Sequence, residues 1–266
     1  MTSGTADGLH YEMHSGPAGA DTVLLSAGLG GSAAFWTPQM PALTDRFRVL
    51  LYDHRGTGRG DRTLIEPHSM EAMAVDMVTV LDATDTIRAH VIGHAAGGLA
   101  GLQLALDRPE RVDRLVVVNS WSRPDPHIAR CFAARTRLLE AFGPAAYVEA
   151  QALFLYPPDW ISRNDARLQA EAPHHIAAFP TAAVMLARID ALLAFDIDAD
   201  LPDITCPVLV SASADDMLVP PLCARRLAER LPNATLDIVP WGGHAFTQTA
   251  SDAFNAKLVA WLAGET

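Results

Sequence analysis

Short runs of apolar residues recur along the chain, and most of them are continuous rather than alternating. Such runs lie near residues 23, 47, 89, 114 and 207, and a further candidate lies near residue 235. Strands that are apolar on both faces are typical of a parallel sheet covered on both sides. The pattern therefore predicts a parallel sheet that is buried between two layers of helices.

Stretches with helical spacing of apolar residues separate these runs. Met70, Met73 and Met77 repeat at helical spacing behind Ser69, a suitable N-cap, and a second stripe occupies residues 254–262. Strands that alternate with helices predict an α/β fold with a mostly parallel, doubly wound sheet. Ligands bind such sheets beyond the carboxyl ends of the strands.

The alternation stops between residues 122 and 205. This stretch contains helical patterns interrupted by prolines, and it has no convincing strand. We therefore expect a core formed by residues 1–121 and 206–266, with residues 122–205 inserted as a helical cap. A cap above the strand ends would exclude water and shape a pocket.

Charge and composition narrow the range of partners. The formal net charge is −11 and no cluster of Lys and Arg offsets it, so neither nucleic acid nor a membrane surface is expected as a partner. The chain has no secretory signal pattern and no run of ~18 apolar residues that would span a membrane. We expect a cytoplasmic protein with reduced cysteines that acts on a small molecule. The oligomeric state stays open, with a homodimer as one expectation.

No metal or other cofactor is expected. The sequence lacks an H-E-x-x-H pair, a cysteine pair with metal-ligand spacing and a P-loop. Its GLGG run also lacks the spacing of a dinucleotide-binding fingerprint.

Gly-rich turns follow several of the predicted strands. SAGLGGS occupies residues 26–32, where small residues let backbone N–H groups face a ligand, and YDHRGTGRG occupies residues 52–60. GHAAG at residues 93–97 lies between an apolar strand and a small-residue helix. Many hydrolases place a catalytic serine at the centre of such a motif, but Ala95 is found here.

Two later strand ends supply a candidate acid and a candidate base. Asp215 and Asp216 follow the apolar run near residue 207. His244 follows Gly242 and Gly243, whose turn would let its imidazole project toward the strand ends.

The order of these motifs resembles that of the α/β-hydrolase superfamily along essentially the whole chain. The segments GLGGSAAFW, YDHRGTGR, GHAAGGLAGLQLALD, EAQALFLYPPDW and WGGHA are further similar to the Rut-pathway D family of pyrimidine catabolism, which also carries alanine at this place. The resemblance implies an α/β-hydrolase fold with an inserted helical cap. It also implies a hydrolase of carbamate or 3-aminoacrylate, two compounds that break down spontaneously in water.

The resemblance also assigns roles to single residues. Ala95 takes the nucleophile position, Asp216 the acid position and His244 the base position. Asp216 is preferred to Asp215 because it stands four residues before Pro220, the spacing usual in these enzymes. Asp215 then becomes a solvated neighbour, although it stays an alternative.

Backbone donors and pocket walls complete the expected site. The oxyanion donors would be the backbone N–H groups of Leu29 and Ala96, the second at a helix N-terminus. The candidate pocket residues are Gly28, Trp36, Trp121 and Tyr156. Each of the aromatic residues also fits an interpretation as core packing.

Other polar residues have two interpretations each. Guanidinium groups pair bidentately with carboxylates, so the cap arginines could anchor an acid, but a solvated helix face is the expectation for any one of them. These arginines are Arg130, Arg135, Arg137 and Arg188. His94 is expected to pack under the turn, and Asp53 and Arg55 to fix the turn after their strand.

Without a hydroxyl at position 95, no acyl-enzyme can form there and serine-type ester hydrolysis is not expected. The favoured hypothesis is a hydrolase of uracil degradation that acts on a C–N bond and releases ammonia. His244, oriented by Asp216, would act as general acid or base, with a water held near Ala95. Two alternatives stay open: a non-catalytic small-molecule-binding protein of this fold, and an esterase or lactonase whose serine was replaced by alanine.

Overall fold

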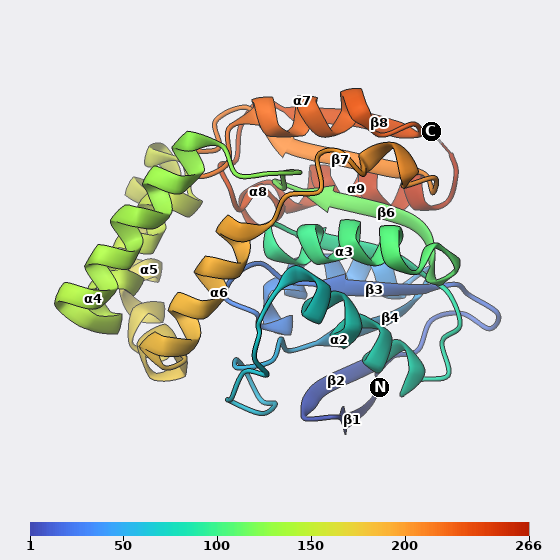
Figure 1. Ribbon diagram of the computed structural model, residues 1–266, viewed down its shortest axis with the longest axis horizontal. Helices are drawn as coiled ribbons and strands as arrows, with labels where there is room; N and C mark the ends of the chain where they lie inside the picture. Colours follow the sequence, from blue (N-terminus) through green and yellow to red (C-terminus); the bar gives the residue numbers. More distant parts are fainter. Residues whose placement is uncertain (266) are drawn as a thin grey trace.

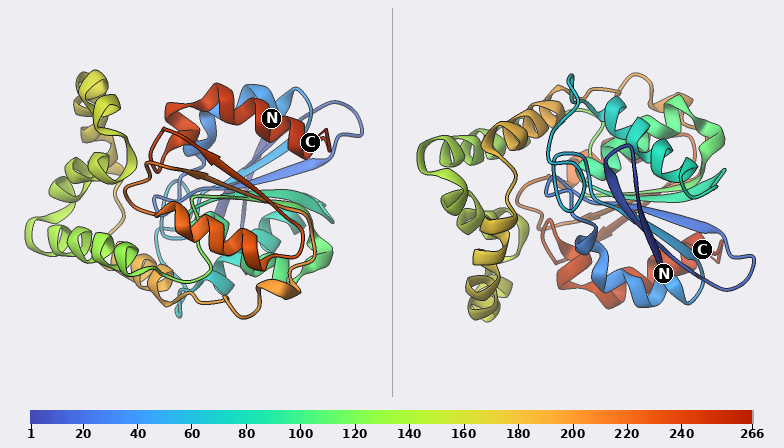
Figure 2. Two further views of the ribbon diagram at one scale, coloured as in Figure 1. Left: turned by 90° about the horizontal axis from the view of Figure 1, so that it is seen from above. Right: turned by 90° about the horizontal axis from the view of Figure 1, so that it is seen from below.

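The computed structural model describes residues 1–265 and contains an eight-stranded sheet with helices on both faces (Figures 1 and 2). The strands are β1 (Thr2–Ala6), β2 (Leu9–His14), β3 (Thr22–Ser26), β4 (Arg48–Tyr52), β5 (Ala89–His94), β6 (Val112–Val118), β7 (Val208–Ser213) and β8 (Ala234–Val239). Their order in the sheet is β1-β2-β4-β3-β5-β6-β7-β8. The pairs that involve β2 are antiparallel and all others are parallel. The predicted α/β-hydrolase fold with a mostly parallel, doubly wound sheet is confirmed.

The helices cover the two faces of the sheet. The longer ones are α2 (Met70–Asp82), α3 (Ala96–Asp107), α4 (Pro126–Leu155), α5 (Pro158–Ala178), α6 (Ala182–Ala194), α7 (Pro221–Arg230) and α9 (Ser251–Leu262). The shorter ones are η1 (Ala33–Gln39), α1 (Met40–Thr44), η2 (Pro109–Arg111), η3 (Leu201–Asp203) and α8 (Phe246–Thr249). Two core clusters result, one between the sheet and helices α2, α3 and α7, the other between the sheet and η1, α1 and α9.

The central strands alternate their side chains between these two cores. In β5, Val91 faces the α2 and α3 side whereas Ile92 faces the η1 and α9 side, and both are fully buried. Every residue of β3, β5 and β7 is buried. Most residues of these strands are therefore apolar, because neither face meets water.

The hairpin formed by β1 and β2 was not predicted from the apolar pattern. Asp7 and Gly8 join the two strands, and both have positive φ angles, of 45° and 79°. Asp-Gly is a strong signal for a tight hairpin turn, because it tolerates this backbone. The hairpin lies at the edge of the sheet, where β2 pairs with β4.

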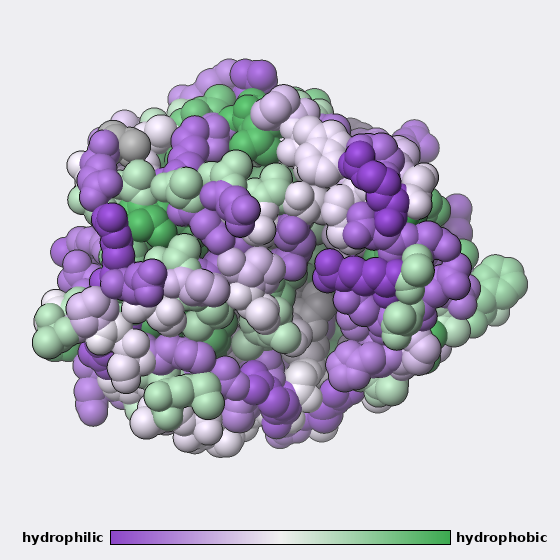
Figure 3. Space-filling model, turned by 180° about the vertical axis from the view of Figure 1, so that it is seen from behind, coloured by the Kyte–Doolittle hydropathy of each residue, from purple (hydrophilic) through white to green (hydrophobic). Residues whose placement is uncertain are grey.

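Helices α4, α5 and α6 follow β6 and precede β7, within the segment expected as a cap. They lie to one side of the sheet, beyond the carboxyl ends of its parallel strands (Figures 1 and 2). On the face seen in Figure 3, hydrophilic and hydrophobic residues are interspersed. Within residues 1–265, no single helix is long and apolar enough to cross a membrane. Helices α5 and α6 taken together have the length and composition of a span, but their axes are bent by 99° relative to each other.

Two glycines allow the turn after β5 to pack against the rest of the core. A Cβ at Gly97 would overlap the carbonyl oxygen of Ser26, and a Cβ at Gly93 would overlap that of Gly97. The backbone of α3 therefore approaches β3 more closely than any side chain would permit. This close approach brings the turn at residue 95 beside the Gly-rich turn after β3.

Replacing Gly97 with alanine is expected to lower the free energy of unfolding by about 1–3 kcal/mol, because the added methyl group overpacks a backbone contact. Urea denaturation measures this change. Gly30→Ala is the matched control, since a Cβ at Gly30 would meet no atom within 4 Å. Equal stability of the two variants would contradict the close packing of α3 on β3.

Candidate active site

The turn between β5 and α3 holds Ala95 in a strained conformation. Ala95 has φ 46° and ψ −109°, and its N–H donates to the carbonyl oxygen of Val118 at 2.8 Å. Such a backbone is unfavourable for a residue with a Cβ and persists only where surrounding contacts impose it. The turn thus has the geometry of a nucleophile elbow, with a methyl group at its tip.

His244 and Asp216 form the acid–base pair of the site. Nδ1 of His244 lies 2.8 Å from Oδ2 of Asp216, and both side chains are buried. The other carboxylate oxygen accepts from the backbone N–H groups of Leu218 and Val219 at 2.7 and 2.9 Å. Because an ionised carboxylate only accepts, Nδ1 carries the proton of the neutral imidazole and Nε2 is left as its basic nitrogen.

Asp215 has a different task from its neighbour. Its carboxylate accepts from the N–H groups of Gly242 and Gly243 at 3.3 and 2.9 Å and from the hydroxyl of Ser213. The side chain is exposed, as expected for a solvated neighbour, but it also fixes the turn that leads to His244. The structure pairs His244 with Asp216 and not with Asp215.

The loop that carries His244 is held by two further side chains. Asn119 donates from Nδ2 to the carbonyl oxygen of His244 at 2.7 Å and accepts from the N–H of Ser213 at 3.1 Å. His94 Nε2 lies 2.9 Å from the same carbonyl oxygen, so this nitrogen carries the proton. Burial lowers the pKa of His94 to about 3, which keeps its ring neutral. His94 packs under the turn as expected, whereas the role of Asn119 was missed.

The two expected oxyanion donors lie in turns that contact each other. Gly97 N–H donates to the carbonyl oxygen of Ala27 at 2.9 Å, which joins α3 to the turn containing Leu29. Ala96 is the first residue of α3, so its N–H has no acceptor within the helix. Gly28 is buried in the same turn, where a Cβ would lie 2.8 Å from Nδ1 of His94.

Arg188 of α6 joins the cap to the Gly-rich turn that contains Leu29. It is fully buried and donates from Nε and Nη2 to the carbonyl oxygen of Leu29, at 3.2 and 3.1 Å. Nη1 donates to the carbonyl oxygen of Arg55 at 3.2 Å, and Nη2 to Nδ1 of His54 at 2.9 Å. The expectation of a solvated helix face is therefore wrong for Arg188, because its side chain crosses into the core.

The contact with Arg188 fixes the protonation of His54. A guanidinium group only donates, so Nδ1 of His54 accepts and Nε2 carries the proton toward the hydroxyl of Ser26, 3.0 Å away. Ser26 lies 2.9 Å from the hydroxyl of Tyr52. Burial and the adjacent guanidinium hold the pKa of His54 well below its ordinary value. A hydrogen-bonded chain thus runs from the guanidinium of Arg188 through the neutral groups of His54, Ser26 and Tyr52 to β3 and β4.

Replacing Arg188 with methionine is expected to reduce both turnover and the free energy of unfolding. Two carbonyl oxygens and a ring nitrogen would lose their buried donor, at a cost of about 1–3 kcal/mol for each unsatisfied group. Leu29 would also lose the contact that fixes its turn. Urea denaturation and an ammonia assay measure the two effects, and the exposed Arg130 gives the control Arg130→Met. Wild-type values for both would show that Arg188 has no such role.

The turn after β4 is fixed as expected. Asp53 accepts from the N–H of Ala33 at 2.8 Å and pairs with Arg59 at 2.7 Å. Arg55 pairs with Asp76 at 2.9 Å, in a largely buried contact.

The aromatic candidates are divided between core and cap. Trp36 and Trp121 are fully buried in the two core clusters on opposite faces of the sheet. Tyr156 stacks on Trp160 in the cap, with ring centroids 4.3 Å apart. It lines a cavity of about 350 Å³ between α4 and α5. The assignment of Trp36, Trp121 and Tyr156 to a substrate pocket stays a prediction.

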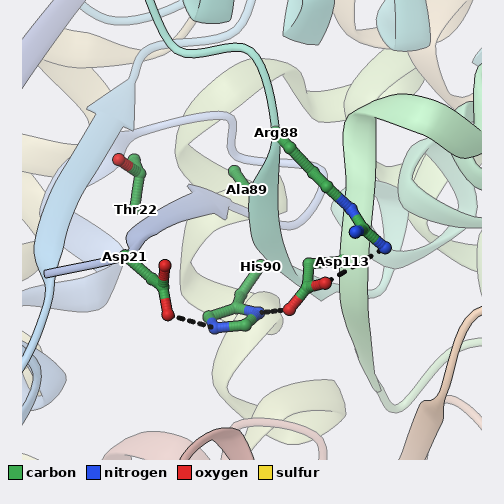
Figure 4. A pocket seen from close by; sticks show the side chains of 6 residues that line it. All are labelled: Asp21, Thr22, Arg88, Ala89, His90 and Asp113. Atoms are coloured by element: carbon green, nitrogen blue, oxygen red, sulfur yellow. Dashed lines mark ion pairs between the residues drawn. The ribbon is translucent and has the colours of Figure 1, made fainter.

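A polar cavity of about 360 Å³ lies at the opposite end of the strands (Figure 4). It is lined by Asp21, Thr22, Arg88, Ala89, His90 and Asp113, which come from the beginnings of β3, β5 and β6. Figure 4 shows His90 between two carboxylates, with Nδ1 3.1 Å from Asp113 and Nε2 3.9 Å from Asp21. Within residues 1–265, no group of at least three His, Cys, Asp or Glu side chains is placed to hold a metal ion.

Comparison with known proteins decides the family. The hydrolase family described as serine aminopeptidase, S33, matches residues 18–248. A protein of Caulobacter sp. (strain K31) named "Putative carbamate hydrolase RutD" is 66% identical over 266 residues, covering 100% of this chain and 99% of that protein. A protein of Variovorax paradoxus (strain S110) with the same name is 55% identical and covers 96% of both chains. The chain belongs to the RutD family of hydrolases.

Solved structures agree with the RutD family fold. The enol-lactonase from Burkholderia xenovorans LB400 is 26% identical, with a TM-score of 0.88 over 98% of this chain and 100% of that one. A thermophilic esterase from Thermogutta terrifontis is 22% identical, with a TM-score of 0.84 over 99% and 98% of the two chains, and demonstrates the shared fold alone. The RutD relatives from Caulobacter and Variovorax confirm the resemblance to the Rut-pathway D family.

Proposed function

We propose that this protein accelerates the breakdown of carbamate, and alternatively of 3-aminoacrylate, with release of ammonia and without a covalent intermediate. The hydrogen-bonded pair of His244 and Asp216 beside an elbow that carries alanine is the observation on which the proposal rests. The RutD relatives support a hydrolase role in the Rut pathway, and their name, putative carbamate hydrolase, favours carbamate.

For carbamate, the protonated His244 would act as general acid. It would deliver a proton from Nε2 to the carbamate nitrogen while the C–N bond breaks, so that ammonia and carbon dioxide leave. Asp216 accepts from Nδ1 at 2.8 Å and thereby stabilises the imidazolium before the transfer. A proton from solvent would then restore His244.

For 3-aminoacrylate, the same pair would act as general base. Tautomerisation gives an imine, and His244 would take a proton from water as its oxygen attacks the imine carbon. Return of that proton to nitrogen would give a carbinolamine. His244 would then transfer the hydroxyl proton to nitrogen as the C–N bond breaks, so that ammonia leaves and malonic semialdehyde remains. Ala95 is small enough to leave room for this water near the N–H of Ala96.

The expected rate enhancement is modest because no nucleophile is present. Triad enzymes that lose a catalytic member retain roughly 10³- to 10⁴-fold acceleration over water through the oxyanion site and binding. The corresponding donors here would be the N–H groups of Leu29 and Ala96. A substrate that already decays in water needs no more than this.

A substoichiometric assay separates this proposal from a non-catalytic binding protein. The protein is incubated with an excess of carbamate or 3-aminoacrylate, and ammonia is followed over time. Several equivalents of ammonia per protein above the buffer rate are expected for one of the two. A binding protein would instead leave the decay unchanged or slow it.

The proposed setting is cytoplasmic, with a small-molecule substrate and no nucleic-acid or membrane partner. The proposed homodimer can be tested by light scattering.

A further inference from the structure

Arg135 is a buried arginine of the cap that takes no part in the hydrogen bonds of Arg188 or of the acid–base pair. Arg135 lies on α4 and is 5% exposed, and its guanidinium carbon is 4.7 Å from the centre of the Tyr147 ring. Phe132 and Phe154 lie at 5.4 and 5.6 Å. Its Nε has no hydrogen-bond partner within residues 1–265. The expectation of a solvated helix face is therefore wrong for Arg135 as well, whereas it holds for the exposed Arg137.

Aromatic stacking does not satisfy this guanidinium. The rings can attract the positive charge, but the N–H donors of the group still need acceptors. Arg55 pairs with Asp76, and Arg188 donates to two carbonyl oxygens and to His54. Burial lowers the pKa of Arg135, and Tyr147 and Cys131 are the groups that oppose this shift within the part of the chain that is described. A buried charge of this kind is costly unless an anion compensates it.

Helix α4 carries Arg135 above the loops of the acid–base pair. Cys131 lies one helical turn before Arg135 on the same buried face, and its Sγ is 3.7 Å from the carbonyl oxygen of Met217, next to Asp216. At the other end of α4, the carbonyl oxygen of Leu155 accepts from the N–H of Ala245 at 2.9 Å. Helix α4 is interrupted at Gly143, and Phe154, whose ring lies near the Arg135 guanidinium, directly precedes Leu155. Arg135 therefore lies between the part of α4 that contacts the acid loop and the part that contacts the loop of His244.

We propose that Arg135 binds the carboxylate of the substrate and so restricts the site to small monoanions. This inference rests on the proposed function, since carbamate and 3-aminoacrylate each carry one carboxylate group. A fork of two N–H donors fits a carboxylate and fixes its orientation. The nitrogen or imine carbon of the substrate is thereby directed toward His244.

Acrylate and acrylamide form a matched pair of probes, since they share a shape and differ in charge. Calorimetric titration of the wild-type protein is expected to show acrylate binding at least ~10-fold tighter than acrylamide, the size of a charge-assisted hydrogen bond. Arg135→Gln is expected to remove this preference. Arg137→Gln, two residues along the same helix, is expected to retain it. Arg135→Lys keeps a cation in case the glutamine variant fails to fold, and should retain part of the preference.

The inference is overturned if the wild-type protein binds the two probes equally, or if Arg135→Gln binds acrylate as tightly as the wild type does. Acrylate has no nitrogen to release as ammonia, so this titration is independent of turnover. Failure of the proposed function appears instead as absence of ammonia release by a protein that still prefers acrylate.

Discussion

Replacing His244 with alanine is expected to lower the rate of carbamate breakdown toward the rate measured in buffer, leaving only the contribution of the backbone donors. The imidazole is the group that would move the proton, and a positioned acid or base contributes about 10²- to 10⁴-fold. Asp216 and the backbone donors would remain, but neither can deliver a proton from the position of Nε2. Loss of ¹³C-carbamate followed by NMR measures the rate constant directly.

The exposed His175 provides a matched control for this experiment, since it lies on α5. His175→Ala is expected to retain the wild-type rate, and its circular dichroism should match that of His244→Ala. A wild-type rate in a folded His244→Ala variant would refute acid–base catalysis by this residue.

Replacing Ala95 with serine is expected to create an esterase activity that the wild-type protein lacks. The turn at φ 46° would direct a hydroxyl toward the end of the imidazole opposite Asp216, and the N-terminus of α3 would stabilise the oxyanion. A burst of about one equivalent of p-nitrophenol from p-nitrophenyl acetate is the signature of an acyl-enzyme.

The double variant Ala95→Ser with His244→Ala is the control for this gain of activity. It should show no burst, because the serine would lack a base. Absence of a burst in the folded single variant would contradict the view that the elbow, the base and the backbone donors are all retained around Ala95.

The sheet and the elbow could be predicted because local sequence dictates them. Strands β3 and β5 are buried on both faces, so most of their residues are apolar, and the pattern is visible from the sequence of each strand alone. Gly93 and Gly97 are required by backbone contacts on either side of Ala95. The spacing of Asp216 before Pro220 identified the acid that pairs with His244.

The burial of Arg135 and Arg188 could not be predicted in the same way. An arginine on an amphipathic helix usually extends from the edge of the apolar face into water. Whether it turns inward depends on what the helix packs against. Arg188 meets the carbonyl oxygen of Leu29, and Arg135 meets the ring of Tyr147. Asn119 was missed for a similar reason, since its partner His244 lies 125 residues away.

The most direct test of the account is the rate constant of ¹³C-carbamate loss as a function of wild-type protein concentration, at fixed pH and temperature. The account predicts a linear increase above the buffer value, with ammonia formed in equal amount. A rate constant that stays at the buffer value at every protein concentration would contradict catalysis of this reaction by His244 and Asp216.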